Sequence, residues 1–252
     1  MSFCVLTINF QRPSIFRLFC ASIDRLRIQT GIDFPVVCVS EPEDKTICDK
    51  HNIYHIEYPN YNVLEKWNVG TEFIQTLDVD YMIVSGSDDI FSTSALSSLI
   101  KEMDNDIDLI GFNKIYVYDT DGVNRGQLLC VTSKGMMGVG KTVHRRVLDS
   151  VRWRPWENLI IRRWGMDAIF YRNISPHVKT KSIVDGIIVD CKNRENLNKF
   201  TMLKSNYHGK LIDSSIFHNF LSKQELDILR GIHSTGLPLK FPRVHKRGRT
   251  LI

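Results

Sequence analysis

The sequence of 252 residues contains no apolar run near the ~18 residues that mark a membrane-spanning helix. Its start is a strand-like apolar run, without the charged segment that opens a secretory signal. We therefore expect a protein that is not secreted, has no membrane partner and works in the cytoplasm. Internal repeats and low-complexity segments are also missing, which favours one α/β domain with an appended lobe.

Paired metal-binding motifs are absent as well. The chain has six cysteines without a Cys-x-x-Cys pair, and its eight histidines include no His-Glu-x-x-His pattern. Cys4 and Cys38 lie inside apolar runs typical of buried strands. Thiols of this kind indicate a reducing compartment, so the sequence predicts neither a disulfide framework nor a structural zinc site.

Acidic residues are scarce in the second half of the chain. Residues 127–252 hold 23 Lys and Arg against 9 Asp and Glu, a balance of +14, whereas residues 1–126 hold 10 against 19, a balance of −9. The net charge of +5 hides this asymmetry. A cationic half attracts nucleic acid or a phosphorylated small molecule, although a solvated face without a partner has the same composition.

Apolar runs alternate with segments of helical periodicity. Strands are predicted over residues 3–8, 34–39, 53–58, 81–84, 109–113, 115–119 and 128–132. Helices are predicted over residues 13–30, 64–77 and 94–103, with a short one ending near 49. Such alternation is typical of βαβ units, so we expect a mostly parallel sheet flanked by helices, with a hairpin turn at Asp121-Gly122.

The apolar run Tyr81–Val84 is followed closely by Ser87, Asp88 and Asp89. Open α/β sheets bind ligands beyond the carboxyl ends of their strands. A hard cation that bridges phosphate oxygens would suit adjacent carboxylates at this position. An acidic turn that caps the following helix is the alternative interpretation.

Five segments, in this order, resemble the GT-A fold glycosyltransferases, especially family 2. They are Thr7–Pro13, Lys66–Gly70, Ser87–Asp89, Gly140–Leu148 and Gly165–Asp167. Order and spacing carry this resemblance, which covers about residues 3–190. It implies a GT-A, Rossmann-like fold with a nucleotide-sugar-binding half (1–134) and a less regular, basic acceptor-binding half with a C-terminal extension (135–252). The implied activity is metal-dependent transfer of a sugar from a nucleotide sugar, a UDP-sugar above all, to a hydroxyl group.

The resemblance also assigns roles to single residues. It implies that Asp89 and Asp88 hold Mn²⁺ or Mg²⁺, that His208 is a further metal or diphosphate ligand, and that Asp167 is the catalytic base. The implied donor-binding residues are Thr7, Asn9, Arg12, Glu41, Lys66, Asn68 and Asp88. The implied acceptor-binding residues are Arg145, Arg146, Trp153, Trp156 and Trp164.

Two positions depart from the pattern of the family. Ser40-Glu41 stands where the family has an acidic pair that reads the nucleobase and ribose, which leaves the donor open. Gly86 stands where the first acid of the Asp-x-Asp element often lies, which leaves metal binding open. The tryptophans among the arginines have two interpretations, because such residues either stack on sugars and bases or belong to the core.

The segment Gly135–Thr142 fits the phosphate-binding pattern G-x-x-x-x-G-K-[ST]. It follows the apolar run 128–131 and would precede a helix, and Ile187–Asp190 could serve as a metal-binding strand end. A nucleotide kinase or NTPase is therefore an alternative function. A chance match is favoured, because a phosphate-binding loop normally begins its domain and here it would follow a complete βαβ half.

The end of the chain is basic: Lys240–Arg249 contains five Lys and Arg and no acid. Such a tail can track a phosphate backbone. One hypothesis is therefore a nucleic-acid acceptor, such as a hydroxymethylated pyrimidine in DNA, in the manner of phage DNA glycosyltransferases acting in the host cytoplasm. A soluble saccharide or glycan precursor is the alternative acceptor, and a catalytically idle nucleic-acid-binding protein is a further possibility. The sequence leaves the oligomeric state open.

Overall fold

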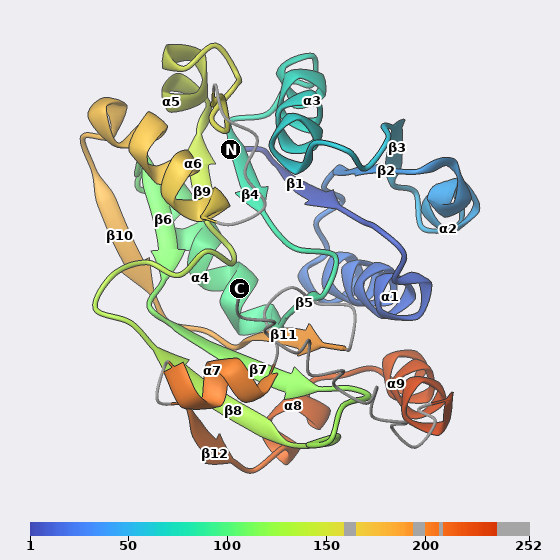
Figure 1. Cartoon of the computed structure of the whole chain (residues 1–252). Helices are drawn as coiled ribbons and strands as arrows, with labels where there is room; N and C mark the ends of the chain where they lie inside the picture. Colours follow the sequence, from blue (N-terminus) through green and yellow to red (C-terminus); the bar gives the residue numbers. More distant parts are fainter. Residues whose placement is uncertain (159–164, 194–199, 207–208, 236–252) are drawn as a thin grey trace, which may run out of the picture.

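The computed structural model describes residues 1–158, 165–193, 200–206 and 209–235 and contains two β-sheets. The first has seven strands in the order β10-β6-β9-β4-β1-β2-β3, and the second has five in the order β12-β8-β7-β11-β5. Figure 1 shows the second sheet below the first, with the carboxy-terminal helix α9 beside α1. Among the described residues, no helix is long and apolar enough to cross a membrane.

The first four strands of the chain form a parallel part of the first sheet, and β10 and β6 form a second parallel pair in it. The first four are β1 (Phe3–Ile8), β2 (Val36–Ser40), β3 (Tyr54–Glu57) and β4 (Tyr81–Val84). The connecting helices are α1 (Pro13–Thr30), α2 (Lys45–Lys50) and α3 (Val63–Gln75). The mostly parallel sheet flanked by helices that the sequence predicts is therefore confirmed, and each of these elements lies within a few residues of its predicted bounds.

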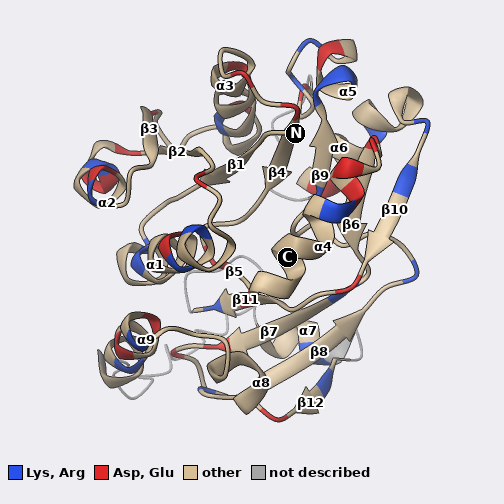
Figure 2. Cartoon of the chain, turned by 180° about the vertical axis from the view of Figure 1, so that it is seen from behind, with Lys and Arg blue, Asp and Glu red and all other residues tan. Residues whose placement is uncertain are grey.

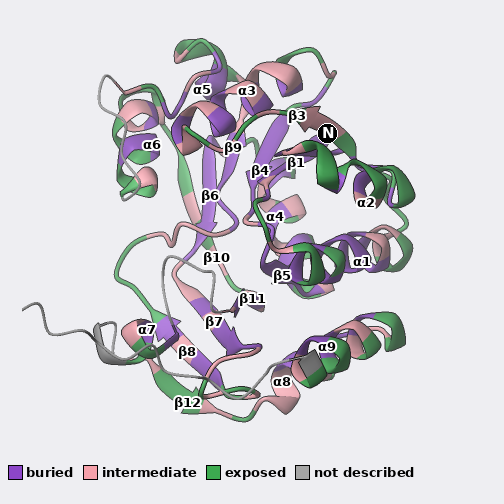
Figure 3. Ribbon diagram, turned by 45° about the vertical axis from the view of Figure 1, so that its right-hand side comes forward, coloured by how far each residue is buried: buried purple, intermediate pink, exposed green. Residues whose placement is uncertain are grey.

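Both faces of this sheet are covered, which explains the uninterrupted apolar runs. Phe3 and Val5 of β1 pack into a core with α1 and α4 (Thr93–Asp104). Cys4 and Leu6 face a second core, formed with α3, α5 (Arg145–Ser150) and α6 (Met166–Ile174). Successive side chains of a strand point to opposite faces, so a strand covered on both sides is apolar throughout. Figure 3 shows the buried residues concentrated along β4, β6 and β9.

The remaining strands combine residues from both sides of position 134. In the first sheet, β9 (Thr142–His144) lies antiparallel between β4 and β6 (Leu109–Phe112), and β10 (Lys181–Val184) pairs with β6. In the second sheet, β11 (Ile188–Lys192) lies between β7 (Lys114–Asp119) and β5 (Asp89–Phe91). The division at residue 134 therefore stays a prediction about donor and acceptor roles, since each sheet contains strands from both halves.

The predicted hairpin is present in the second sheet. Strand β7 pairs antiparallel with β8 (Leu128–Thr132), and the Asp119 carboxylate accepts the backbone N–H groups of Gly122 and Asn124 at 2.6 and 2.9 Å. Strand β12 (Lys210–Ile212) extends the sheet, and α7 (Phe200–Asn206) packs on it. One expectation was incomplete: the acidic turn after β4 leads into the short strand β5 before α4 begins.

A buried ion pair attaches α9 (Lys223–Thr235) to the rest of the fold, after the short helix α8 (Ser215–His218). Arg25 of α1 donates to Glu225 at 2.9 Å and to the Phe91 carbonyl of β5 at 2.7 Å. Glu225 also accepts the Ser222 N–H at 2.7 Å, while the Ser222 hydroxyl accepts the N–H of Glu225, a capping box. The two charged side chains are 3% and 0% exposed.

We expect Glu225→Gln to reduce the free energy of unfolding by about 3–5 kcal/mol, because Arg25 would remain as a buried charge without its partner. Asp227→Asn on the same helix is the matched control, since its ion pair with Arg230 is exposed and should contribute less than about 1 kcal/mol. Urea unfolding followed by circular dichroism measures both. Equal midpoints for the two variants would show that the Arg25–Glu225 pair does not hold α9 in place.

Candidate functional site

The parallel strands bring three loops to one edge of the first sheet. Because β1, β2 and β4 run in the same direction, the segments after Ile8, Ser40 and Val84 emerge side by side. This is the edge at which open α/β sheets bind ligands, and most residues predicted to contact the donor lie there.

Asn9 and Arg12 join these loops. The Asn9 side chain donates to Asp44 at 2.8 Å and accepts from the Ser87 hydroxyl at 2.9 Å. Arg12 donates to Asp88 at 2.7 Å and to Ser87 at 2.8 Å. The structure thus brings together Asn9, Arg12 and Asp88, as the sequence predicts. It adds Asp44, to which the sequence analysis assigned no role, and gives Ser87, noted in the sequence beside Asp88, two hydrogen-bond partners.

Lys66 supports the β1 loop from α3. Its ammonium group is buried and donates to the Asn9 carbonyl at 2.6 Å and to the Asn60 side chain at 3.2 Å. Burial lowers the pKa of Lys66. A lysine held in this way fixes the position of Asn9. The role of Lys66 in binding the sugar donor stays a prediction.

Three other predicted donor residues occupy different environments. Thr7 is fully buried in β1, and its hydroxyl has no hydrogen-bond partner among the described residues. Glu41 is partly exposed at the end of β2, where its backbone carbonyl accepts from His55. Asn68 is 1% exposed and its side-chain oxygen accepts the backbone N–H of Trp156 at 3.0 Å. The Asn68 side chain thus fixes the segment before α6 from inside the core, and its role as a donor ligand stays a prediction.

Asp88, Asp89 and Asp190 form what we call the acidic cluster. One carboxylate oxygen from each lies within 4.8 Å of the other two, and all three residues are buried. Asp88 ends the loop after β4, Asp89 begins β5, and Asp190 lies directly opposite Asp89 on the antiparallel strand β11. Asp190 was noted in the sequence only as part of the alternative phosphate-binding pattern. Its pairing with Asp89 depends on a contact between residues a hundred positions apart.

Lys192 lies next to the acidic cluster. Its ammonium group is 2.6 Å from Asp190 and 3.8 Å from Asp88. Burial would lower the pKa of Lys192, but the charges of Asp190 and Asp88 outweigh it and the pKa is raised. Residues 190 and 192 alternate with Cys191, so Asp190 and Lys192 share one face of β11. Lys192 was not predicted, because one lysine in a strand has no motif to mark it.

Two carboxyl groups of the cluster, those of Asp89 and Asp190, bind protons more tightly than usual. Burial, followed by the charges of Asp190 and Asp88, raises the pKa of Asp89 well above its ordinary value. Burial raises the pKa of Asp190 from 3.8 to about 6, although Lys192 opposes the change. Like charges placed directly opposite on paired strands are unfavourable, and burial increases that repulsion.

The donor set fits a divalent metal ion. The Asp190 Oδ1 atom is buried and has no hydrogen-bond partner among the described residues. Carboxylate oxygens are the ligands preferred by Mg²⁺ and suit Mn²⁺, and a cation between them would remove their repulsion. The prediction that Asp88 and Asp89 can hold a metal is therefore compatible with the geometry, and Asp190 adds a ligand that was not assigned.

Asp167, the predicted base, lies at the start of α6 with its side chain 70% exposed. It pairs with the buried Lys141 ammonium at 3.3 Å. Lys141 connects it to the candidate site, because the Lys141 carbonyl accepts the N–H of Val84 at the end of β4. The Asp167 carboxylate can lie against the backbone of residue 138 because that residue is glycine: a Cβ there would lie 2.3 Å from an Asp167 oxygen.

The predicted acceptor cluster is mostly structural. Trp153 and Trp156 are 1% and 3% exposed, and Trp156 stacks on Trp67 with ring centroids 5.0 Å apart. Arg145 donates to backbone carbonyls of residues 75, 77 and 79 and lies over Trp153. Arg146 pairs with Asp106 and Asp108. The two indoles are used in packing and the two guanidinium groups in hydrogen bonds and ion pairs, and the acceptor-binding roles of these four residues stay predictions. Trp164 and His208 lie outside the described residues.

The structure contradicts the alternative phosphate-binding loop. Thr142 begins β9, which pairs antiparallel with β4, and the next helix, α5, begins only at Arg145. The Thr142 hydroxyl donates to the Gly140 carbonyl, and the Lys141 ammonium pairs with Asp167. A phosphate-binding loop of this pattern requires a helix at that point, with its backbone N–H groups directed at the ligand.

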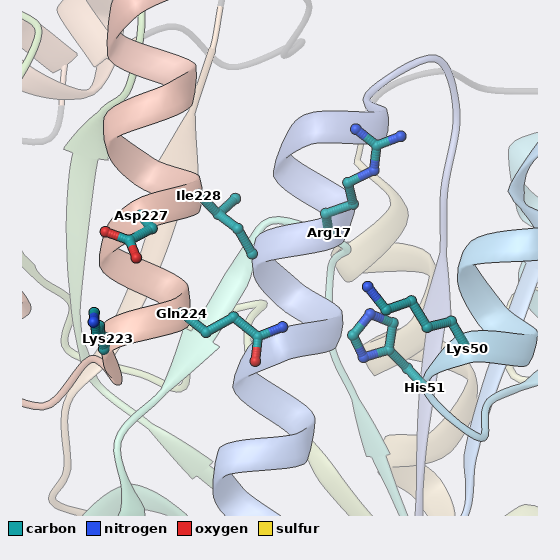
Figure 4. Close-up of a pocket in the computed structure, with 7 residues that line it drawn as sticks. All are labelled: Arg17, Lys50, His51, Lys223, Gln224, Asp227 and Ile228. Atoms are coloured by element: carbon teal, nitrogen blue, oxygen red, sulfur yellow. The ribbon is translucent and has the colours of Figure 1, made fainter.

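A surface hollow of about 660 Å³ lies elsewhere, between α1, α2 and α9. Figure 4 shows Arg17 from α1, Lys50 and His51 from the end of α2, and Gln224 and Asp227 from α9 around it. None of the residues predicted to bind donor, metal or acceptor lines this hollow. It is a separate feature from the acidic cluster.

Comparisons with solved structures agree with this fold. A crystal structure of S. aureus TarS 1-349 is 13% identical, with a TM-score of 0.55, and the match covers 76% of this chain and 60% of that one. The complex of TarS 1-349 with UDP is 14% identical, with a TM-score of 0.54, and covers 77% and 61%. The chain thus spans about 60% of the TarS fragment. At such identity the likeness shows the fold alone, which is that of the GT-A glycosyltransferases, as predicted from the sequence.

No family profile matches the sequence. No curated protein matches it either. The residues and their geometry, together with the fold, therefore carry the functional interpretation.

We expect Asp89→Asn to stabilise the metal-free protein at pH 8, because it removes a buried charge and keeps an acceptor for the Gly86 N–H. The raised pKa of Asp89 means that the folded state binds a proton more tightly than the unfolded state. The wild-type protein should therefore gain stability as the pH falls from 8 towards 5 and lose it again as the pH rises. The variant should have a higher Tm at pH 8, by ~2–4 °C for each kcal/mol gained.

Thermal unfolding in EDTA at pH 5 and pH 8 measures this difference. Asp185→Asn is the control, since Asp185 has a 95% exposed side chain. A variant that is less stable than the wild type at pH 8, or that keeps the full pH dependence, would contradict the electrostatic account of the cluster.

Proposed function

We propose that this protein transfers a sugar from a nucleoside-diphosphate sugar, with a UDP-sugar as the donor, to a hydroxyl acceptor. The main support is the acidic cluster at the ligand-binding edge of a GT-A fold, with the unpaired, buried Asp190 Oδ1. The solved complex of TarS with UDP supports a uridine nucleotide as the first donor to test.

The chemistry requires positive charge at the diphosphate leaving group. Asp88, Asp89 and Asp190 would hold Mn²⁺ or Mg²⁺, which when bound neutralises charge developing on the phosphate oxygens. Arg12 is tied to Asp88 and Ser87, so its guanidinium is placed beside the same region. Asn9, held by Lys66 and Asp44, keeps the β1 loop in place.

The acceptor hydroxyl must lose its proton as the new glycosidic bond forms. In this proposal the exposed Asp167 carboxylate accepts that proton, and the ion pair with Lys141 orients it. Gly138 leaves the space that this carboxylate occupies.

The first test is turnover of a panel of nucleotide sugars, measured as nucleotide release with and without acceptor. A UDP-sugar with Mn²⁺ should be hydrolysed slowly, and UDP with Mn²⁺ should raise the Tm, whereas ATP with Mg²⁺ should not. Asp89→Ala should remove turnover and leave the circular dichroism spectrum unchanged. Full activity of Asp89→Ala in EDTA would exclude the metal role, and failure of all nucleotide sugars to bind would exclude the proposed function.

The role of Asp167 has a separate test. Asp167→Asn should lower kcat by about 10²–10⁴-fold with little change in the KM for the donor, because a missing base acts on the chemical step. Gly138→Ala should lower kcat by a smaller factor, because its methyl group would displace the carboxylate. Asp185→Asn, an exposed aspartate, is the matched control. A normal kcat for Asp167→Asn would assign the base elsewhere.

Fewer observations support a nucleic-acid acceptor than the sequence suggested. A hydroxyl on nucleic acid, such as hydroxymethylated DNA, is now supported mainly by the basic balance of the second half, since Trp153 and Trp156 are buried. Figure 2 shows acidic and basic segments mixed on α1, α2 and α9, and the basic tail lies outside the described residues. A soluble saccharide is the competing acceptor.

Binding to duplex DNA distinguishes the two acceptors. If DNA is the acceptor, affinity should fall steeply as salt rises from 50 to 200 mM, and removal of residues 240–252 should reduce the slope of log K against log salt. Undetectable binding at low salt, or a slope that the truncation leaves unchanged, would favour the saccharide.

A further inference from the structure

Lys192 is a buried cation inside a candidate metal site. Its side chain is 10% exposed, and its ammonium group lies 2.6 Å from Asp190 and 3.8 Å from Asp88. The resemblance to glycosyltransferases assigns this residue no role. A cation of the protein therefore already occupies part of the space in which a metal ion would meet the same carboxylates.

The charges explain why a cation is needed there. Asp89 and Asp190 face each other across two paired strands, with Asp88 beside them. Arg12 reaches Asp88 from the β1 loop, and Lys192 reaches both Asp88 and Asp190 from β11. Among the described residues, Arg12 and Lys192 thus supply two positive charges to the three carboxylates. Without Lys192, the repulsion between the buried carboxylates would be much larger.

The backbone of Lys192 is fixed, so only its side chain can move. Its carbonyl accepts from both the N–H and the hydroxyl of Thr120, and its strand pairs with β7. A lysine carries its charge on a flexible four-carbon chain, so the ammonium group can change partner without moving the strand.

We propose that Lys192 is the internal counter-ion of the acidic cluster, which weakens binding of a divalent cation to the free protein and couples it to binding of a diphosphate. A divalent ion that approaches Asp190 is repelled by the ammonium group and competes with it for the same oxygen atoms. A diphosphate gives the ammonium group another anionic partner, so the cation binds more tightly when the diphosphate is present. The second part rests on the proposed function, whereas the first concerns the protein and the cation only.

Lys192→Met tests the first part, with Mn²⁺ binding to the free protein measured by electron paramagnetic resonance. We expect Mn²⁺ to bind this variant at least about tenfold more tightly than the wild type, because one positive charge next to the ion has been removed. Lys192→Gln should show the same direction and retains a hydrogen-bond donor to Asp190, so it serves if Lys192→Met does not fold. Lys192→Arg should bind Mn²⁺ as weakly as the wild type.

Lys181→Met is the matched control, since Lys181 also lies on a strand but is exposed and contacts Tyr171. It should leave the Mn²⁺ affinity unchanged. Asp190→Asn should weaken Mn²⁺ binding in both the wild-type and the Lys192→Gln background, which locates the ion at the cluster. Unchanged or weaker Mn²⁺ binding to both Lys192→Met and Lys192→Gln would overturn the proposal.

The coupling is measured by repeating the Mn²⁺ titration with UDP and with inorganic pyrophosphate. In the wild type, either anion should tighten Mn²⁺ binding by at least about tenfold, and in Lys192→Gln the gain should be smaller by a similar factor. An equal gain in both proteins would overturn the coupling. Failure of the proposed function would be seen differently, as absence of nucleotide-sugar turnover while the Mn²⁺ affinities of the free proteins still differ.

Discussion

The repulsion between three buried carboxylates is the constraint on which this site depends. Asp89 and Asp190 are held opposite each other by the ladder between β5 and β11, and Asp88 joins them from the loop after β4. The fold cannot separate these groups without breaking the ladder, so it must supply positive charge. Lys192 and Arg12 supply part of it. A buried group of carboxylates favours a cation, and through that cation a ligand rich in phosphate oxygens.

The second sheet and α9 hold the carboxylates of the acidic cluster in position. Arg25 contacts the Phe91 carbonyl at the end of β5 and Glu225 of α9, so the strand that carries Asp89 is connected to the carboxy-terminal helix through buried polar contacts. Lys141 connects the end of β4 to Asp167, because its carbonyl accepts the Val84 N–H and its ammonium group pairs with the Asp167 carboxylate. The acidic cluster therefore depends on segments distributed over more than two hundred residues of chain.

For the residues predicted to bind the acceptor, the sequence pattern did not distinguish a surface cluster from residues of the core. Trp153, Trp156 and Arg145 are neighbours in the sequence and resemble a stacking surface. In the fold, the indoles fill the core beneath α3 and α6, and the guanidinium group of Arg145 satisfies carbonyls at the end of α3 and the turn after it. Interleaved aromatic and basic residues have the same sequence pattern in both cases, because burial depends on which elements pack over them.

The sequence by itself predicted a mostly parallel sheet flanked by helices, the succession of its first strands and helices along the chain, and the position of Ser87–Asp89 at a strand end, because hydrophobic periodicity is a local property. The resemblance to GT-A glycosyltransferases grouped Asn9, Arg12 and Asp88, which the structure brings together. Only the tertiary structure decided that Asp190 and Lys192 complete the acidic cluster and that Asn68, Trp153 and Trp156 are internal. These outcomes depend on pairing between distant strands, and the free energy of that pairing comes from the whole core.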